Sequence, residues 1–181
     1  LSDLAAVRRV ADQIAESEER LDALVNNAGA LLPERRLSVD GYEMTFAAMV
    51  LGPFVLTNGI VPLLERTAGD AGGSRVVNVA SGGMYLQGLH LDDLQMEREL
   101  YRGSIAYARA KLALVTLTRE WSRRLRGQAI TVNAMHPGWA DTPGVVGSLP
   151  TFHRLIGTRL RTPEEGADTI VHYQQGMRVG F

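Results

Sequence analysis

Two side chains that could share a proton lie four positions apart in this sequence. Tyr107 and Lys111 belong to a helix-forming run over residues 104–126, and residues four apart project from the same face of a helix. A fixed positive charge beside a phenol favours the phenolate and lowers the phenol pKa from about 10. A tyrosine in that setting can act as a general acid or base. The same spacing is also typical of a solvated surface pair that contributes only a few tenths of a kcal/mol.

Three short apolar runs have the composition of buried strands, and a turn signal follows each of them. They cover residues 21–26, 75–80 and 129–135. A strand that is apolar on both faces belongs inside a parallel sheet that helices cover. Helical patterns over residues 38–66 and 104–126 separate the three runs. This alternation predicts an α/β fold, a Rossmann-like doubly wound parallel sheet with helices on both faces.

The residues that end the three runs are mostly polar or glycine. Asn26 and Gly29 lie at the end of the first run, Ser81 follows the second, and residues 136–142 follow the third. In open α/β sheets, ligands bind beyond the carboxyl ends of the strands. The candidate residues therefore converge on one edge of the predicted sheet, beside the helix that carries Tyr107.

Two further helices and one irregular segment complete the pattern. The first helix can be capped by Ser2 or Asp3, and the last is capped at Thr162 with Pro163 at its first position. Between them, residues 139–161 contain two prolines and three glycines and show no clear period. We expect this segment to form a loop or lid over a ligand.

Composition excludes several classes of function. The chain has 181 residues, of which 45% are hydrophobic and 22% charged, as is typical of one globular domain. A formal net charge of -1 predicts no attraction to nucleic acid or anionic lipid. The sequence contains no cysteine, which excludes disulfides and thiol catalysis, and its four histidines lack metal-ligand spacing. We therefore expect no metal site.

The longest apolar region covers residues 44–64 and is interrupted by Pro53, Asn58 and Pro62. Because a membrane span needs about 20 predominantly apolar residues, we interpret the region as a buried core helix and expect no integral membrane segment. The sequence shows no basic stretch followed by an apolar run and a cleavage site. These features lead us to expect a cytoplasmic protein.

Four groups of residues carry a resemblance to a known family. In chain order they are Asn26-Asn27-Ala28-Gly29, Ser81, Tyr107 with Lys111, and Pro137-Gly138 followed by Thr142. Their order and spacing resemble the short-chain dehydrogenase/reductases, and the likeness extends over residues 1–171. Residues 78–124 look like the retinol-dehydrogenase-like branch, and residues 81–84 with 136–144 are similar to its dehydrogenase/reductase member 12 subgroup.

The resemblance implies an NAD(P)-dependent oxidoreductase, with residues 1–181 as a single, partial Rossmann-type dehydrogenase domain. Such an enzyme transfers a hydride between a nicotinamide and a lipophilic alcohol or carbonyl. Tyr107 would be the general acid or base, while Lys111 would lower the pKa of Tyr107 and bind the nicotinamide ribose. Ser81 would hold the substrate oxygen and stabilise charge that develops on it.

The same resemblance assigns residues to the cofactor. The adenosine side would be lined by Asn26, Ala28 and Gly29. The nicotinamide would be edged by Pro137, Gly138 and Thr142. The cofactor would be NADP or NAD with only a slight lean to NADP, because the residue that separates them follows a strand that this sequence lacks. The partners would be a small lipophilic substrate and further copies of the chain, in a homodimer or homotetramer, and no nucleic acid.

Two features depart from the family pattern. The family has an asparagine where this chain has Met49, and that asparagine helps a bound water to carry protons from the lysine. A thioether is a weak acceptor and no donor, so slow turnover is expected. The family's glycine-rich phosphate-binding turn and the N-terminal strands around it are also absent. An alternative interpretation is a catalytically inactive or fragmentary Rossmann-like homologue that acts as a binding or assembly module.

Some candidate residues also have purely structural interpretations. Ser81 precedes two glycines and could be a turn former. His136 is expected to be a packed or capping residue, since the family gives its position no chemical role. Trp121 and Leu125 are expected in the core or in a subunit contact. The ordered combination of motifs favours the chemical roles of Ser81, Tyr107 and Lys111.

Overall fold

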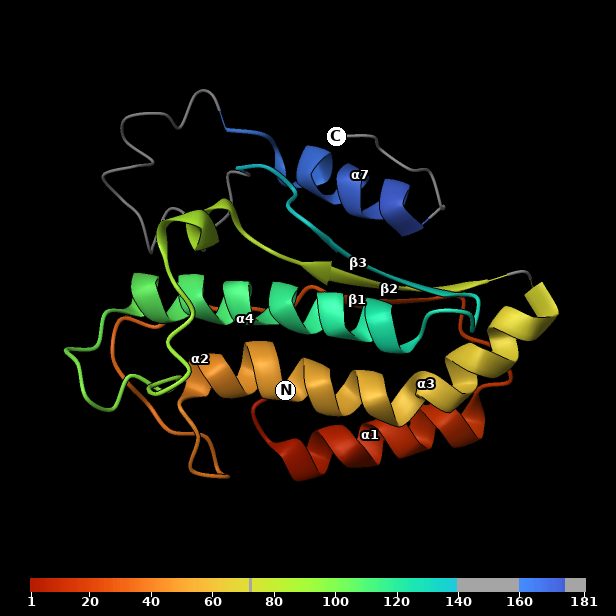
Figure 1. Ribbon diagram of the computed structural model, residues 1–181, viewed down its shortest axis with the longest axis horizontal. Coiled ribbons are helices and arrows are strands. Elements are labelled where there is room, and N and C mark those ends of the chain that lie inside the picture. The colour runs from red at the N-terminus through yellow and green to blue at the C-terminus, as the bar shows by residue number, and fades with distance from the viewer. Residues whose placement is uncertain (72, 140–159, 175–181) are drawn as a thin grey trace.

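The computed structural model describes residues 1–71, 73–139 and 160–174. Within them, three parallel strands form one sheet in the order β1 (Ala23–Asn26), β2 (Ser74–Val79) and β3 (Ile130–Met135) (Figure 1). The register pairs Asn26 with Asn78 and Val79 with Met135, so the carboxyl ends of the strands lie at one edge. The three predicted strands are confirmed, with their ends shifted by one or two residues.

Helices cover both faces of this sheet. α3 (Gly52–Ala71) and α4 (Gly103–Arg124) connect neighbouring strands and lie on one face, where α1 (Leu4–Ser17) packs against α3 (Figure 1). α7 (Pro163–Gln174) lies on the opposite face. The arrangement confirms the predicted α/β fold, a parallel sheet between two helical layers.

Each face of the sheet has its own apolar core. On the α3 and α4 face, the buried cluster contains Ala11, Ile60, Leu64, Ala68, Val76, Leu114, Trp121, Leu125, Ile130 and Val132. On the α7 face, Ile170 packs against a buried cluster of Val77, Val79 and Met135. Trp121 and Leu125 are 4% and 7% exposed, so both are core residues.

The long apolar helix, predicted over residues 38–66, begins later than the sequence pattern indicates. A bridge between Leu37 and Glu43 closes a turn before it, and helical structure starts with α2 (Met44–Phe46). The buried Glu43 carboxylate accepts hydrogen bonds from two backbone N–H groups of α2. This cap fixes the start of the helix, because it satisfies N–H groups that have no partner inside the helix.

A π-helical segment, η1 (Ala47–Leu51), follows α2 and leads directly into α3. Such a segment places one extra residue in the helical turn and so changes the direction of the side chains around it. Met49 lies at its centre and is 1% exposed. The departure from the family pattern therefore lies within the π-helical segment of this helix.

The run Met44–Gly69 is long and apolar enough, by length and composition, to cross a membrane, with a mean hydropathy of 1.8. The core helix of a soluble protein passes the same test, and half of the apolar window is buried inside the structure. The run packs against α1, α4 and β2. This packing agrees with the expected core helix, while the expectation of no integral membrane segment remains a prediction.

The two predicted helix caps are present. The Asp3 carboxylate accepts a hydrogen bond from the Ala6 N–H at the start of α1. At the start of α7, Thr162 and Glu165 form a reciprocal pair, in which the Glu165 N–H donates to the Thr162 hydroxyl and the Thr162 N–H donates to the Glu165 carboxylate. Both helices therefore begin where the sequence predicts, because a side chain there satisfies the free N–H groups.

Candidate active site

A cavity of about 470 Å³ lies at the carboxyl edge of the sheet, beside the first turns of α4. It brings together most of the site residues that the sequence predicts: Gly29, Ser81, Tyr107, Lys111, Pro137 and Gly138. These residues come from segments far apart in the chain, and the parallel order of the strands places them at one edge. The predicted convergence is therefore present in the structure.

Ser81 and Tyr107 form the polar centre of the cavity. Ser81 follows β2 in an extended conformation, and its side chain lies near the half-buried Tyr107. Burial raises the pKa of Tyr107 above its ordinary value of 10.0, and the polar Ser81 side chain opposes that rise. The pKa shift is thus opposite to the lowering that the family resemblance implies, because burial outweighs the favourable contacts that the phenolate finds in the chain.

Lys111 stands one helical turn after Tyr107 on the same face of α4. Its side chain is almost fully buried, and its Nζ lies 5.7 Å from the centroid of the Tyr107 ring. Nζ donates a hydrogen bond of 2.6 Å to the backbone carbonyl of Val79, at the end of β2. Burial lowers the pKa of Lys111 from 10.5 to about 8. An ammonium has three N–H donors, of which this bond uses one.

Gly29 and Met49 form the wall behind Lys111. A Cβ atom on Gly29 would lie 3.4 Å from Sδ and Cε of Met49 and 3.5 Å from Nζ of Lys111. The thioether of Met49 and the ammonium of Lys111 therefore both border Gly29. The departure from the family pattern identified Met49, and the structure places it in the same neighbourhood as the lysine.

Two of the residues predicted for the cofactor, Asn26 and Ala28, do not line the cavity. Asn26 is buried below the cavity, where its Nδ2 donates to Thr57 Oγ1 at 3.1 Å and to Asn78 Oδ1 at 2.7 Å. Its amide thus joins β1, β2 and α3 and is not among the residues that line the cavity. Ala28 is exposed and also outside the lining. Thr142 lies outside the described residues.

His136 and Trp139 form the wall opposite α4. Their rings meet edge to face, with centroids 6.0 Å apart and planes at 86°. A Cβ on Gly82 would come within 3.1 Å of His136 Nε2, so the two rings lie directly against the turn that carries Ser81. Burial lowers the pKa of His136 below 6.5, and its buried Nδ1 has no partner in the part of the chain that the structure describes. His136 is packed, as expected, but it also lines the cavity.

Several lining residues carried no signal in the sequence. Besides Asn27 of the first motif, the cavity contacts Ala30, Leu31, Leu86, Gln87 and Ile105. Ile105 stands two positions before Tyr107, yet helical spacing assigns it to another face. Only the fold of the segment after η2 (Gly82–Leu86) and of the turn after β1 brings these side chains to the cavity. Leu31, Leu86 and Ile105 add to the apolar part of its surface.

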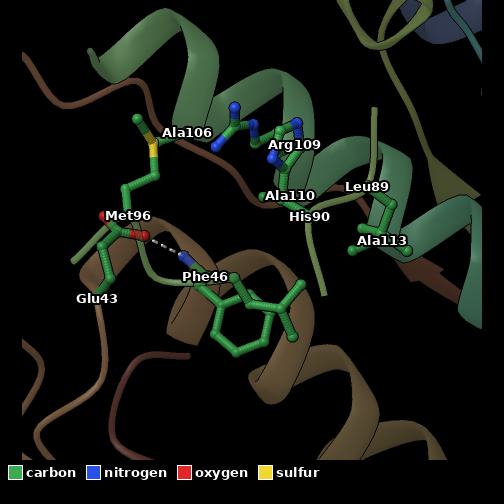
Figure 2. A pocket seen from close by; sticks show the side chains of 10 residues that line it. Glu43, Phe46, Leu89, His90, Met96, Ala106, Arg109, Ala110 and Ala113 are labelled. Atoms are coloured by element: carbon green, nitrogen blue, oxygen red, sulfur yellow. Dashed lines mark hydrogen bonds between the residues drawn. The ribbon is translucent and has the colours of Figure 1, made fainter. Parts of the chain in front are cut away.

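A second, smaller hollow lies on the other side of α4 (Figure 2). Its volume of about 10 Å³ is the space of about one water. Figure 2 shows the carboxylate of Glu43 bonded to the backbone of Phe46, the contact that caps α2. Arg109 also lines the hollow and forms an ion pair with Glu99. These charged groups support helix ends and a loop, so the hollow holds no arrangement for chemistry.

Comparison with known proteins places the chain among reductases and dehydrogenases. A family model described as enoyl-(acyl carrier protein) reductase matches residues 1–171. Human dehydrogenase/reductase SDR family member 12 is 44% identical over 156 residues, which cover 86% of this chain and 47% of the relative. Human retinol dehydrogenase 13 is 36% identical over 199 residues, covering 98% of this chain and 59% of the relative.

A solved structure agrees with these relatives. The RhlG protein of Pseudomonas aeruginosa, in an active-site complex with NADP, superposes with a TM-score of 0.59 and 28% identity, over 91% of this chain and 56% of that chain. The chain spans about half the length of the curated relatives that it matches, 47% and 59% for the two human proteins. The retinol-dehydrogenase-like resemblance predicted from the motifs is confirmed by these matches.

Proposed function

The chain belongs to the short-chain dehydrogenase/reductase family, and on that premise we propose that it works as an NAD(P)-dependent oxidoreductase on a lipophilic alcohol or carbonyl. One observation carries the proposal: Ser81, Tyr107 and the buried Lys111 meet at the polar centre of a single cavity. A solvated surface pair of Tyr and Lys would share no such enclosed site. The cavity therefore argues against interpreting Tyr107 and Lys111 as a surface pair.

Tyr107 handles the proton in this proposal. In the direction of reduction, its hydroxyl gives a proton to the substrate oxygen, and in oxidation its phenolate takes that proton back. The Ser81 hydroxyl, which lies near Tyr107, donates to the same substrate oxygen and stabilises negative charge on it. When bound, the nicotinamide supplies or accepts the hydride. Lys111 then favours the phenolate by its positive charge.

The cavity fits a nicotinamide cofactor beside these residues. Lys111 has N–H donors beyond the one that binds Val79, which suits the hydroxyls of a ribose. Gly29 has no Cβ, so a ligand can approach the backbone in front of Met49 and Lys111. Pro137 and Gly138 border the same space. The NADP complex of RhlG supports NADP as the preferred cofactor, with NAD as the other candidate.

An apolar lining supports a lipophilic substrate. Leu31, Leu86, Ile105 and Trp139 surround the space in front of Ser81 and Tyr107. Burial of an alkyl or polyene chain against such side chains contributes about 25 cal/mol per Å². Retinol, the alcohol in the name of retinol dehydrogenase 13, belongs to this class of compound. The proposed class is therefore a large apolar alcohol and its aldehyde or ketone.

The test combines cofactor binding with turnover. NADPH and NADH are titrated into the purified protein while the fluorescence of Trp139 and Trp121 is followed, and apolar alcohols and aldehydes are then assayed with the tighter cofactor. Tyr107→Phe should lower turnover by at least about 10²-fold, because the general acid is lost, while cofactor binding and the melting temperature stay near wild type. Tyr85→Phe is the matched control, since Tyr85 is 79% exposed and outside the cavity.

Two results would count against the proposal. Wild-type turnover by Tyr107→Phe would remove the proton-transfer role from Tyr107. Absence of binding and turnover in the wild-type protein would favour the alternative, a non-catalytic homologue that serves as a binding or assembly module. Light scattering on the same sample tests the proposed homodimer or homotetramer. A cytoplasmic location also stands as a proposal, which fractionation of cells would test.

A further inference from the structure

Arg161 connects the end of β3 to the start of α7. Its Nη1 donates to the carbonyl of Pro137 at 3.0 Å and to Thr169 Oγ1 at 3.1 Å. Its Nη2 donates to the carbonyl of Glu165 at 2.6 Å, and its backbone N–H donates to the carbonyl of Trp139 at 2.8 Å. A guanidinium can make these side-chain bonds together, because its donors are arranged as a rigid planar fork.

The stem of Arg161 also lies against the turn it bonds to. Gly138 has a φ of +84°, a conformation that favours glycine, and a Cβ there would come within 2.9 Å of Arg161 Cδ. The glycine therefore serves two purposes, since it permits the turn and leaves room for the arginine. Pro137, Gly138 and Arg161 form one packed unit.

On its other side, Arg161 is attached to a firmly placed helix. The reciprocal cap between Thr162 and Glu165 fixes the first turn of α7. Further along the helix, Ile170 packs against the buried cluster of Val77, Val79 and Met135 on the sheet. The turn after β3 is thus held to the sheet a second time, through α7.

The attachment through α7 positions one wall of the cavity. Trp139 follows Gly138 directly, and its Cζ2 lies 3.6 Å from the place of a Cβ on Gly82. Its ring meets His136 edge to face, and both rings line the cavity that contains Tyr107. Arg161 itself is not among the lining residues. Any effect of Arg161 on a ligand must therefore pass through the turn of residues 137–139.

We propose that Arg161 is a positioning residue: its guanidinium holds the turn of residues 137–139 on α7 and thereby keeps Trp139 and His136 in place as the substrate-facing wall. The effect on substrate rests on the proposed function. Loss of the guanidinium leaves the carbonyls of Pro137 and Glu165 without these donors and frees Trp139 to shift. The KM of a long apolar substrate, which contacts the full wall, should therefore rise more than the KM of a short one.

The kinetic test compares Arg161→Met and Arg161→Lys with the wild-type protein. Methionine keeps much of the aliphatic part of the side chain but has no N–H donors. Lysine keeps the positive charge but lacks the planar set of N–H donors of a guanidinium. For Arg161→Met, the KM of a long-chain alcohol should rise about tenfold, the equivalent of one lost charge-assisted hydrogen bond, with kcat within about twofold and the KM of a short alcohol little changed. Arg161→Lys should lie between. Arg8→Met, on the exposed face of α1, is the control and should match the wild type.

A second readout does not depend on turnover. Trp121 is 4% and Trp139 is 38% exposed, so acrylamide should quench mainly Trp139, which Trp139→Phe verifies. In Arg161→Met the quenching constant should increase, with far-ultraviolet circular dichroism unchanged. Unchanged quenching and an unchanged ratio of long-chain to short-chain KM would overturn the inference. Increased quenching in a protein that shows no turnover at all would instead reject the proposed function and leave the positioning role supported.

Discussion

Two polar clusters lie within a few residues of each other at the carboxyl edge of the sheet, and they differ in how their hydrogen bonds are used. The buried amide cluster consists of Asn26, Asn78, Thr57 and Thr118. Asn26 donates to Thr57 and Asn78, Asn78 donates to Thr118 Oγ1 at 2.9 Å, and Thr118 donates to a carbonyl of α4 at 2.8 Å. All four residues are at most 6% exposed.

The reactive cluster, Ser81, Tyr107 and Lys111, faces a cavity instead. Burial shifts the pKa of Lys111 down to about 8 and that of Tyr107 upward, so each group is held away from its ordinary protonation equilibrium. Thr118 stands seven positions after Lys111, two turns along the same face of α4, so one helix supplies both clusters. The difference teaches that polar groups with all partners inside the protein support the fold, whereas groups with donors to spare are available for chemistry.

The largest expected effect separates activity from stability within the reactive cluster. Lys111→Met should lower turnover by at least about 10²-fold, because the charge that favours the Tyr107 phenolate is lost. The free energy of unfolding at pH 7 should change by less than about 1 kcal/mol, since relief from burying an ammonium offsets the lost bond to Val79. Steady-state assays and urea unfolding measure the two quantities. A large loss of stability would place Lys111 with the structural cluster.

The converse is expected in the buried amide cluster. Asn78→Ala should lower the free energy of unfolding by about 2–4 kcal/mol, because the Asn26 amide and the Thr118 hydroxyl each lose a buried partner. Turnover per folded molecule should stay within about twofold of wild type. Thr116→Ala on the same helix is the control, because that threonine is exposed and should cost little. A specific loss of turnover in stable Asn78→Ala protein would break the distinction between the clusters.

The lowered pKa of Lys111 predicts a pH dependence of stability. Its unfolded pKa is 10.5 and its folded pKa about 8, so between these values the unfolded state binds more protons and the free energy of unfolding rises with pH. From pH 8 to 10 the rise should be on the order of 2 kcal/mol. Above pH 10 the raised pKa of Tyr107 acts in the opposite direction, because folded Tyr107 keeps a proton that the unfolded chain loses. Urea unfolding in this window should show the rise in wild type and a flat profile in Lys111→Met.

The fold was largely predictable from local patterns. Both faces of β2 are largely buried, as Val76, Val77 and Val79 on its two faces indicate, and the caps at Asp3 and Thr162 carry their own signals. The start of α2 was not predictable, because periodic apolar residues continue before it. The helix begins where it does because the buried Glu43 carboxylate caps it. This carboxylate also accepts a hydrogen bond from the hydroxyl of Tyr101, which is distant in the sequence. Such a contact appears only once the chain is folded.

The residues of the candidate site also differ in how well the sequence predicted them. Ser81, Tyr107 and Lys111 follow from motif order, and the structure brings them to one cavity. Asn26 belongs to the same motif as Gly29, yet its amide points to the sheet face that α3 covers, because strand residues alternate between the two faces and the register places it beside Asn78. Arg161 carried no signal, since its bonds to Pro137 and Glu165 depend on how α7 docks. The sequence predicted the residues that meet at the cavity better than the residues that support them.

The smallest expected effect concerns Met49. Replacing this one side chain tests the comparison between the buried amide cluster and the reactive cluster. Its thioether and the Lys111 ammonium both border Gly29, and the family has at this position an amide that helps a water to carry protons. Met49→Asn should therefore raise turnover by about tenfold, as a positioned proton-transfer partner is restored. Met49→Leu keeps an apolar side chain of similar size and should leave turnover within about twofold. Equal rates in the two variants, measured with the same alcohol across pH 6 to 9, would mean that Lys111 exchanges protons through the cavity alone and that the amide has no part in this chain.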